Sequence, residues 1–259
     1  MLRATFPSDL HAAAAQASVE FLSALDGVEA ITLVGSSARR ADANDLDLSV
    51  LVSEPKVGEA VVESFSAFAF ASADVRRLSA AGPFMEVDVG WYTGAFAPGL
   101  RGWTTGPDDF ELAIGNELAY STPLWLGNGR FDDLRTAWLP YYDDDVRRTR
   151  LAAARMYAIN DLEHVAVMLK RDERFHAFHR LYLAFQGFLQ AVFIARRTYP
   201  ISYDKWIGEQ VIGLLRLPDL WSELPGILGI DRLEPGRLAA SASRLRQLLD
   251  EHAPADAAL

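Results

Sequence analysis

The stretch AITLVGSSARRADANDLDLSV, residues 30–50, predicts two strands joined by a polar turn. Its first apolar run, residues 30–34, ends at Gly35 and Ser36, and its second run begins at Asp45. Side chains two apart in a strand point to the same face, so we expect Asp45 and Asp47 to project side by side. Neighbouring carboxylates repel each other unless a cation lies between them. The stretch therefore predicts a cation bound through oxygen.

The cation expected at this site is Mg²⁺. This ion usually takes one or two carboxylates and fills its remaining positions with water and substrate phosphates. The adjacent turn suits phosphate, because Gly35 lets the backbone come close and turn N–H groups bind anionic oxygen. The residues thus indicate a metal–triphosphate site. The alternative is an edge strand whose acids simply face solvent.

A second acidic run, FMEVDVGWY at residues 84–92, predicts a further strand. Glu86 and Asp88 fall on one face, and the apolar residues between them fall on the other. We expect this face to join the Asp45–Asp47 pair from a neighbouring strand. One of the two acids would then be a metal ligand and the other a base, and the sequence leaves open which is which.

These motifs resemble those of the DNA polymerase β-like nucleotidyltransferase superfamily. Its signature is an apolar residue, Gly-Ser, a loop, Asp-x-Asp and a later carboxylate on an adjacent strand. Within the superfamily, the chain is most similar to antibiotic nucleotidyltransferases of the aminoglycoside and lincosamide type that carry a helical C-terminal domain. Residues 36–39 also resemble the Ser-x-x-Arg of small bacterial members. Residues 86–89 are similar to the Glu-Val-x-Val strand of streptomycin and spectinomycin adenylyltransferases, in which the glutamate is the base.

The resemblance implies an α+β fold, with a small mixed-sheet catalytic domain over residues 1–135 and an all-α helical bundle over residues 136–259. It implies transfer of a nucleoside monophosphate from a triphosphate, ATP first among the candidates, to a hydroxyl of a small acceptor, with release of pyrophosphate. The implied catalytic residues are Asp45, Asp47, Glu86 and Asp88, of which Asp45, Asp47 and Asp88 bind the metal, and the implied nucleotide-binding residues are Gly35, Ser36, Ser37, Arg39 and Lys205.

Apolar periodicity supports this division of the chain. In the first part it predicts helices from residue 9 to Gly27, at 57–70 and at 107–118, and strands at 30–34, 45–52, 73–78, 84–92 and 120–126. After residue 135 it predicts helices at 143–170, 173–197, 204–215 and 236–251, whose stripes would pack as a bundle. Lys205 lies between aromatic residues and could reach a triphosphate, or the segment could simply complement a helix end.

Composition narrows the class of partner. The 259-residue chain is 50% apolar, has no cysteine and carries a formal net charge of −10. Such a charge disfavours nucleic acid and suits a cationic acceptor of the aminoglycoside kind. Five acids could line a negative cleft or, in the first three cases, form a helix N-terminus: Asp143, Asp144, Asp145, Asp161 and Glu163.

No apolar run is long enough to cross a membrane, so we expect a cytoplasmic protein. The three histidines at 164, 176 and 179 lack paired ligand spacing and are expected to be surface or core residues. A homodimer is left open. Two rival functions also remain: a regulatory or antitoxin-like transferase of the same fold that modifies a protein or RNA, and a nucleotide-binding module without catalysis.

Overall fold

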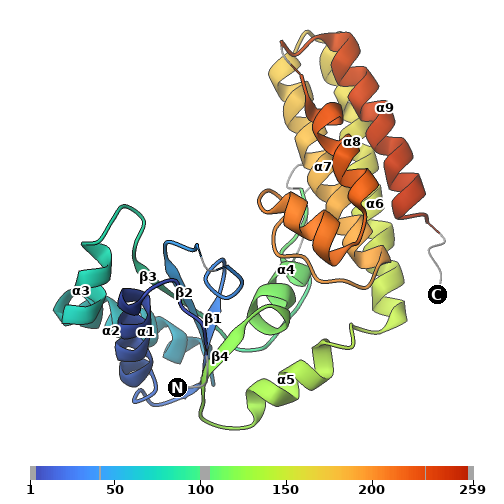
Figure 1. Cartoon of the computed structure of the whole chain (residues 1–259). Coiled ribbons are helices and arrows are strands. Elements are labelled where there is room, and N and C mark those ends of the chain that lie inside the picture. The colour runs from blue at the N-terminus through green and yellow to red at the C-terminus, as the bar shows by residue number, and fades with distance from the viewer. Residues whose placement is uncertain (1–3, 41, 100–105, 231, 256–259) are drawn as a thin grey trace. The chain divides into compact units, whose positions relative to one another are not determined.

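A computed structural model describes residues 4–40, 42–99, 106–230 and 232–255 (Figure 1). The chain forms two compact units. The first comprises residues 1–97 and 113–140, and the second comprises residues 98–112 and 141–259. A small mixed sheet in the first unit and a set of helices in the second confirm the predicted α+β fold.

The sheet of the first unit has four strands in the order β3-β2-β1-β4. These are β1 (Val28–Val34), β2 (Leu46–Val52), β3 (Val87–Tyr92) and β4 (Thr122–Leu126). β1 pairs antiparallel with β2 and β4, whereas β2 and β3 run parallel. β3 is therefore an edge strand that begins beside the start of β2.

The two faces of the sheet differ in character because side chains alternate along each strand. Leu48 and Val50 of β2, with Leu33 of β1, belong to the apolar core on one face. Helices α1 (Asp9–Leu22), α2 (Pro55–Ala71) and α3 (Ala73–Ser79) supply the rest of that core. The opposite face, called the polar face below, carries Asp47 and Ser49 of β2 and Asp88, Gly90 and Tyr92 of β3.

A helix of mixed geometry leads to the last strand of the sheet. α4 (Phe110–Ile114) continues directly into the π-helix η1 (Gly115–Ala119), and α5 (Arg130–Trp138) follows β4. Glu117 of η1 hydrogen-bonds to the side chain of Ser49, so η1 contacts the polar face. π-Helical turns interrupt the regular bonding of a helix and are frequent at functional sites.

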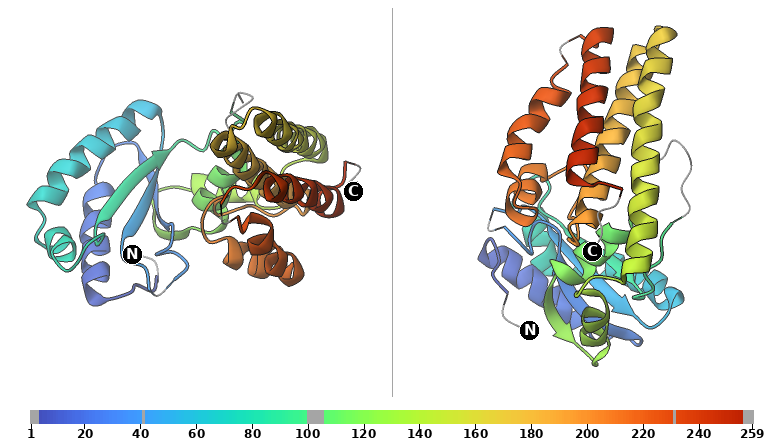
Figure 2. Two further views of the ribbon diagram at one scale, coloured as in Figure 1. Left: turned by 90° about the horizontal axis from the view of Figure 1, so that it is seen from above. Right: turned by 90° about the vertical axis from the view of Figure 1, so that its right-hand side faces the viewer.

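The second unit is a helical bundle. Its helices are α6 (Asp144–Lys170), α7 (Arg174–Ala195), the π-helix η2 (Glu209–Leu214), α8 (Pro218–Leu228) and α9 (Pro235–His252). α6, α7 and α9 run side by side (Figure 2) and share one apolar core. Across the described ranges, none of the helices combines the length and apolarity that a membrane crossing requires.

Several predicted elements need correction. Residues 73–79 form the helix α3 and not a strand, because the Ser72 hydroxyl caps the helix by accepting the Val75 N–H. The acidic strand begins at Val87 and not at Phe84, whose φ of 61° lies in the left-handed region. The helix expected at 107–118 starts only at Phe110 and ends in η1. The helix expected at 204–215 begins only at residue 207 and is π-helical over η2, and α5 and α8 were not predicted.

The division of the chain also differs from the predicted boundary at residue 135, which falls within α5. Residues 98–112 group with the helical unit because of a buried polar network. Arg150 donates to Asp108 at 2.7 Å and to Glu111 Oε2 at 2.6 Å, and Gln190 donates to the same Glu111 oxygen at 2.9 Å. Tyr142 completes the set with a 2.6 Å hydrogen bond to Glu111, which is fully buried. These bonds tie the segment to α6 and α7.

Candidate metal and nucleotide site

Three carboxylates converge at the start of β2 and β3. Asp45, Asp47 and Asp88 each offer one carboxylate oxygen, and these atoms all lie within 4.8 Å of one another. Asp47 and Asp88 are direct neighbours in the parallel register, and Asp45 lies one residue before β2. The predicted acidic group is therefore assembled by two adjacent strands.

The spacing of these oxygens suits a divalent cation. Mg²⁺ holds its ligands at 2.0–2.1 Å in an octahedron, so any two of them lie about 3 to 4 Å apart. Oxygens that already lie within 4.8 Å reach such positions through small side-chain rotations. Asp45 and Asp47 are half-buried and Asp88 is exposed, which leaves one side of the group open to water and phosphate.

Gly35, at the end of β1, is required by this arrangement. Its φ of 64° is a conformation that residues with a Cβ rarely adopt. A Cβ atom on Gly35 would also lie 1.9 Å from Oδ2 of Asp47. The backbone of the turn therefore lies directly against the Asp47 carboxylate.

The side chains of the turn divide into two kinds. Ser36 faces the acidic group, with its hydroxyl 3.5 Å from Oδ1 of Asp45. Ser37 and Arg39 stabilise the turn itself: the Ser37 hydroxyl donates to the Val34 carbonyl at 3.1 Å, and the Arg39 guanidinium donates to the Gly35 carbonyl at 2.6 Å. Their predicted contacts with nucleotide stay predictions.

A histidine of α1 holds the loop before Asp45. The His11 ring lies 3.0 Å from the Asn44 carbonyl through Nε2 and 2.7 Å from the Ser8 hydroxyl through Nδ1. Since a carbonyl only accepts, Nε2 carries the proton of the first bond. His11 is 3% exposed, so α1 fixes the backbone next to Asp45, the first aspartate of the acidic group. The sequence pattern gave no sign of this role.

Glu86 and Lys205 are the two predicted site residues that the first unit's acidic group and turn do not include. Glu86 is exposed and lies one residue before β3, where its carbonyl accepts the Leu46 N–H at 2.8 Å. In the part of the chain that the structure describes, the three-carboxylate group does not include it. Lys205 is an exposed residue of the second unit, so its predicted contact with nucleotide stays a prediction.

Glu117 is a polar-face residue that the sequence did not indicate. Burial raises its pKa from 4.5 to about 7, and the hydrogen bond with Ser49 acts in the opposite direction. Ser49 follows Asp47 by two residues on the same face of β2. The Glu117 carboxyl, which bonds to Ser49, therefore lies next to the acidic group. Its position depends on how η1 packs on the sheet, which no local pattern encodes.

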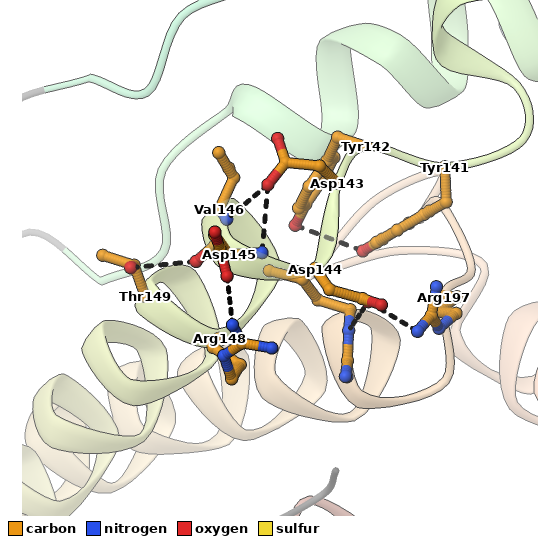
Figure 3. A network of polar contacts seen from close by, with 10 residues as sticks. Tyr141, Tyr142, Asp143, Asp144, Asp145, Val146, Arg148, Thr149 and Arg197 are labelled. Carbon is orange, nitrogen blue, oxygen red and sulfur yellow. Dashed lines mark hydrogen bonds and ion pairs between the residues drawn. The ribbon is translucent and has the colours of Figure 1, made fainter. Parts of the chain in front are cut away.

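Four of the five acids predicted to line a negative cleft have partners of their own, and Figure 3 shows three of them, Asp143, Asp144 and Asp145. Asp143 caps α6 by accepting the N–H groups of Asp145 and Val146, each at 3.0 Å. Asp144 binds Arg197 at 2.5 Å and Arg147 at 3.2 Å, and these bonds hold its pKa below the usual value. The remaining pairs are Asp145 with Arg148 and Asp161 with Arg180. These contacts favour the alternative of a capped helix N-terminus.

Comparison with known proteins adds one match. Residues 119–207 match the model of a domain of unknown function, DUF4037. The matched segment begins at the end of η1 and includes β4, α5, α6 and α7, so it draws on both units. No curated protein matches the chain.

Proposed function

We propose that the protein is a Mg²⁺-dependent nucleotidyltransferase that moves a nucleoside monophosphate, with ATP as the leading donor, to a hydroxyl of a small molecule. The observation that carries the proposal is the approach of three carboxylate oxygens within 4.8 Å, directly beside the left-handed Gly35 turn. Metal-binding acids next to a phosphate-binding turn are the parts that phosphoryl chemistry needs.

Each residue has a distinct role in the proposed reaction. Asp45, Asp47 and Asp88 would hold Mg²⁺, which supplies charge neutralisation at the triphosphate. Gly35 and Ser36 would bind phosphate oxygens through the backbone and the hydroxyl. The acceptor oxygen attacks the α-phosphorus, the bond to pyrophosphate breaks, and the acceptor proton passes to a carboxylate.

The base is one of two exposed acids at the start of β3, Asp88 or Glu86. Asp88 lies on the polar face within the acidic group, whereas Glu86 lies just before the strand. With Glu86 as base, Asp45, Asp47 and Asp88 all remain for the metal, whereas with Asp88 as base, Asp45 and Asp47 remain. Comparison of Glu86→Gln and Asp88→Asn at several pH values separates the two roles, since loss of the base removes the acidic limb of the rate profile.

The proposal is tested by incubation of the protein with Mg²⁺, α-labelled nucleotides and a panel of aminoglycosides and lincosamides. We expect pyrophosphate release and a labelled small product, both lost in Asp47→Asn and retained in Glu63→Gln, which changes an exposed residue of α2.

Other outcomes identify the rival functions. Label transferred to protein or RNA would indicate the regulatory transferase. Nucleotide bound with Mg²⁺ but never consumed would indicate a binding module. Activity in Asp47→Asn equal to that of the wild type would contradict the assigned site.

A further inference from the structure

One face of α6 carries apolar side chains that solvent reaches. Met156 is 47% exposed, Ala152 is exposed and Ile159 is partly exposed. These residues are three or four apart, so they are neighbours on one side of the helix. In the right-hand view of Figure 2, α6 lies at one edge of the bundle. The outer side of such a helix is normally polar, so this face differs from an ordinary solvated surface.

The same face borders a groove. The groove measures about 500 Å³, and its lining is largely apolar, with Ala255 on the side opposite the apolar residues of α6. Arg155 fixes that side, because its guanidinium donates to the carbonyl of Leu249 at 3.0 Å and to that of Ala253. A preformed apolar groove of this kind is a typical seat for an amphipathic helix.

Charges of opposite sign lie at the two ends of this face. Arg148 precedes Met156 by eight residues, and the exposed Glu163 follows it by seven. Arg148 pairs with Asp145 one turn earlier (Figure 3), and both side chains are more than half exposed. Exposed ion pairs contribute little to stability, so Arg148 can exchange this partner at small cost.

A second copy of α6 that runs antiparallel matches this pattern. With a two-fold axis between residues 155 and 156, Arg148 of each copy lies opposite Glu163 of the other. Ala152 then lies opposite Ile159, so a small side chain faces a large one, as interdigitation of helices requires. Parallel helices would instead bring like charges together at both ends. The face is therefore self-complementary only in the antiparallel arrangement.

We propose that the face of α6 from Arg148 to Glu163 binds a second copy of this chain, with the two helices antiparallel. These residues span about 22 Å of helix, which is short for an interface between proteins. We therefore expect weak association, with a dissociation constant in the micromolar range. The inference is independent of the proposed reaction.

Sedimentation velocity of the full chain at about 1 to 300 µM tests the proposal. The wild type should shift from monomer to dimer as the concentration rises. Arg148→Glu and Glu163→Arg should each weaken the dimer at least about tenfold, because like charges then face each other at both ends of the interface. The double variant should restore it, since each new glutamate meets a new arginine. Arg174→Glu is the control: it breaks a similarly exposed ion pair in α7 and should dimerise as the wild type does.

A single cysteine gives a second measurement. The chain has no cysteine, so the disulfide of an oxidised Met156→Cys variant can only join two copies. We expect it to form faster than in Phe175→Cys, although Phe175 is the more exposed residue. Equal rates would contradict the contact between the two helices. A wild type that stays monomeric throughout the range would overturn the inference, as would a dimer that survives both single charge reversals or a double variant that stays as weak as either of them.

Discussion

The substitution Glu117→Gln probes the cost of a buried carboxylate on the polar face. Burial raises the pKa of Glu117 from 4.5 to about 7. The folded protein thus holds the proton more tightly than the unfolded chain, and stability falls as the pH rises from 4.5 to about 7. At about 1.36 kcal/mol for each pKa unit, ionisation costs about 3 kcal/mol above that range. Glutamine never ionises and still offers an oxygen to Ser49.

We therefore expect the stability of Glu117→Gln relative to the wild type to rise with pH. The difference in their free energies of unfolding should increase by about 3 kcal/mol, in favour of the variant, from about pH 4 to pH 8. Urea titrations followed by fluorescence, with EDTA present, measure this difference. Glu63→Gln in the exposed face of α2 is the control and should show no such trend. A difference between Glu117→Gln and wild type that stays constant with pH would refute the reasoning, as would a carboxyl carbon of Glu117 that titrates near pH 4.5 by NMR.

Three further substitutions test the supports of the fold and the site. Gly35→Ala should cost about 1–3 kcal/mol of stability because of the left-handed backbone, and it should displace Asp47 because of the 1.9 Å contact. Denaturant titration measures the first effect and Mn²⁺ affinity the second. Unchanged Mn²⁺ affinity would count against the close contact between Gly35 and Asp47. His11→Ala should weaken Mn²⁺ binding through the released Asn44 carbonyl while the circular dichroism spectrum stays the same; intact affinity would show that α1 does not position the site. Arg150→Met should destabilise the helical unit by about 3–5 kcal/mol, since it removes the cationic partner of the buried Glu111 carboxylate, and a wild-type urea midpoint would contradict this.

The sequence predicted the parts of the site that depend on local periodicity. Alternation of side chains along a strand predicted that Asp45 and Asp47 lie together, and the same rule predicted from residues 84–92 that Asp88 lies on a face beside them. The structure has all three in one group. The Gly-Ser turn was recognised because glycine lets the backbone come close to a ligand, and the structure gives Gly35 a positive φ that residues with a Cβ rarely adopt. The long amphipathic stripes of α6 and α7 likewise predicted the bundle.

The remaining features depend on contacts between distant segments. Glu117 meets Ser49 only because η1 packs on the polar face, and Glu111 is buried only because Arg150 and Gln190 surround it. α3 was mistaken for a strand because its short apolar pattern does not distinguish the two periods, and its cap at Ser72 decides the matter.

The binding of Mg²⁺ together with α,β-methylene-ATP tests the central claim most directly. Isothermal titration of the wild type with the analogue should show binding that depends on Mg²⁺. Asp45→Asn and Asp47→Asn should each lower the affinity at least about tenfold, as loss of groups at a metal site does, while Glu63→Gln binds normally. Binding of the analogue to the wild type that is equally tight with Mg²⁺ or with EDTA, or that survives both aspartate substitutions, would contradict the claim that these carboxylates form a metal–triphosphate site.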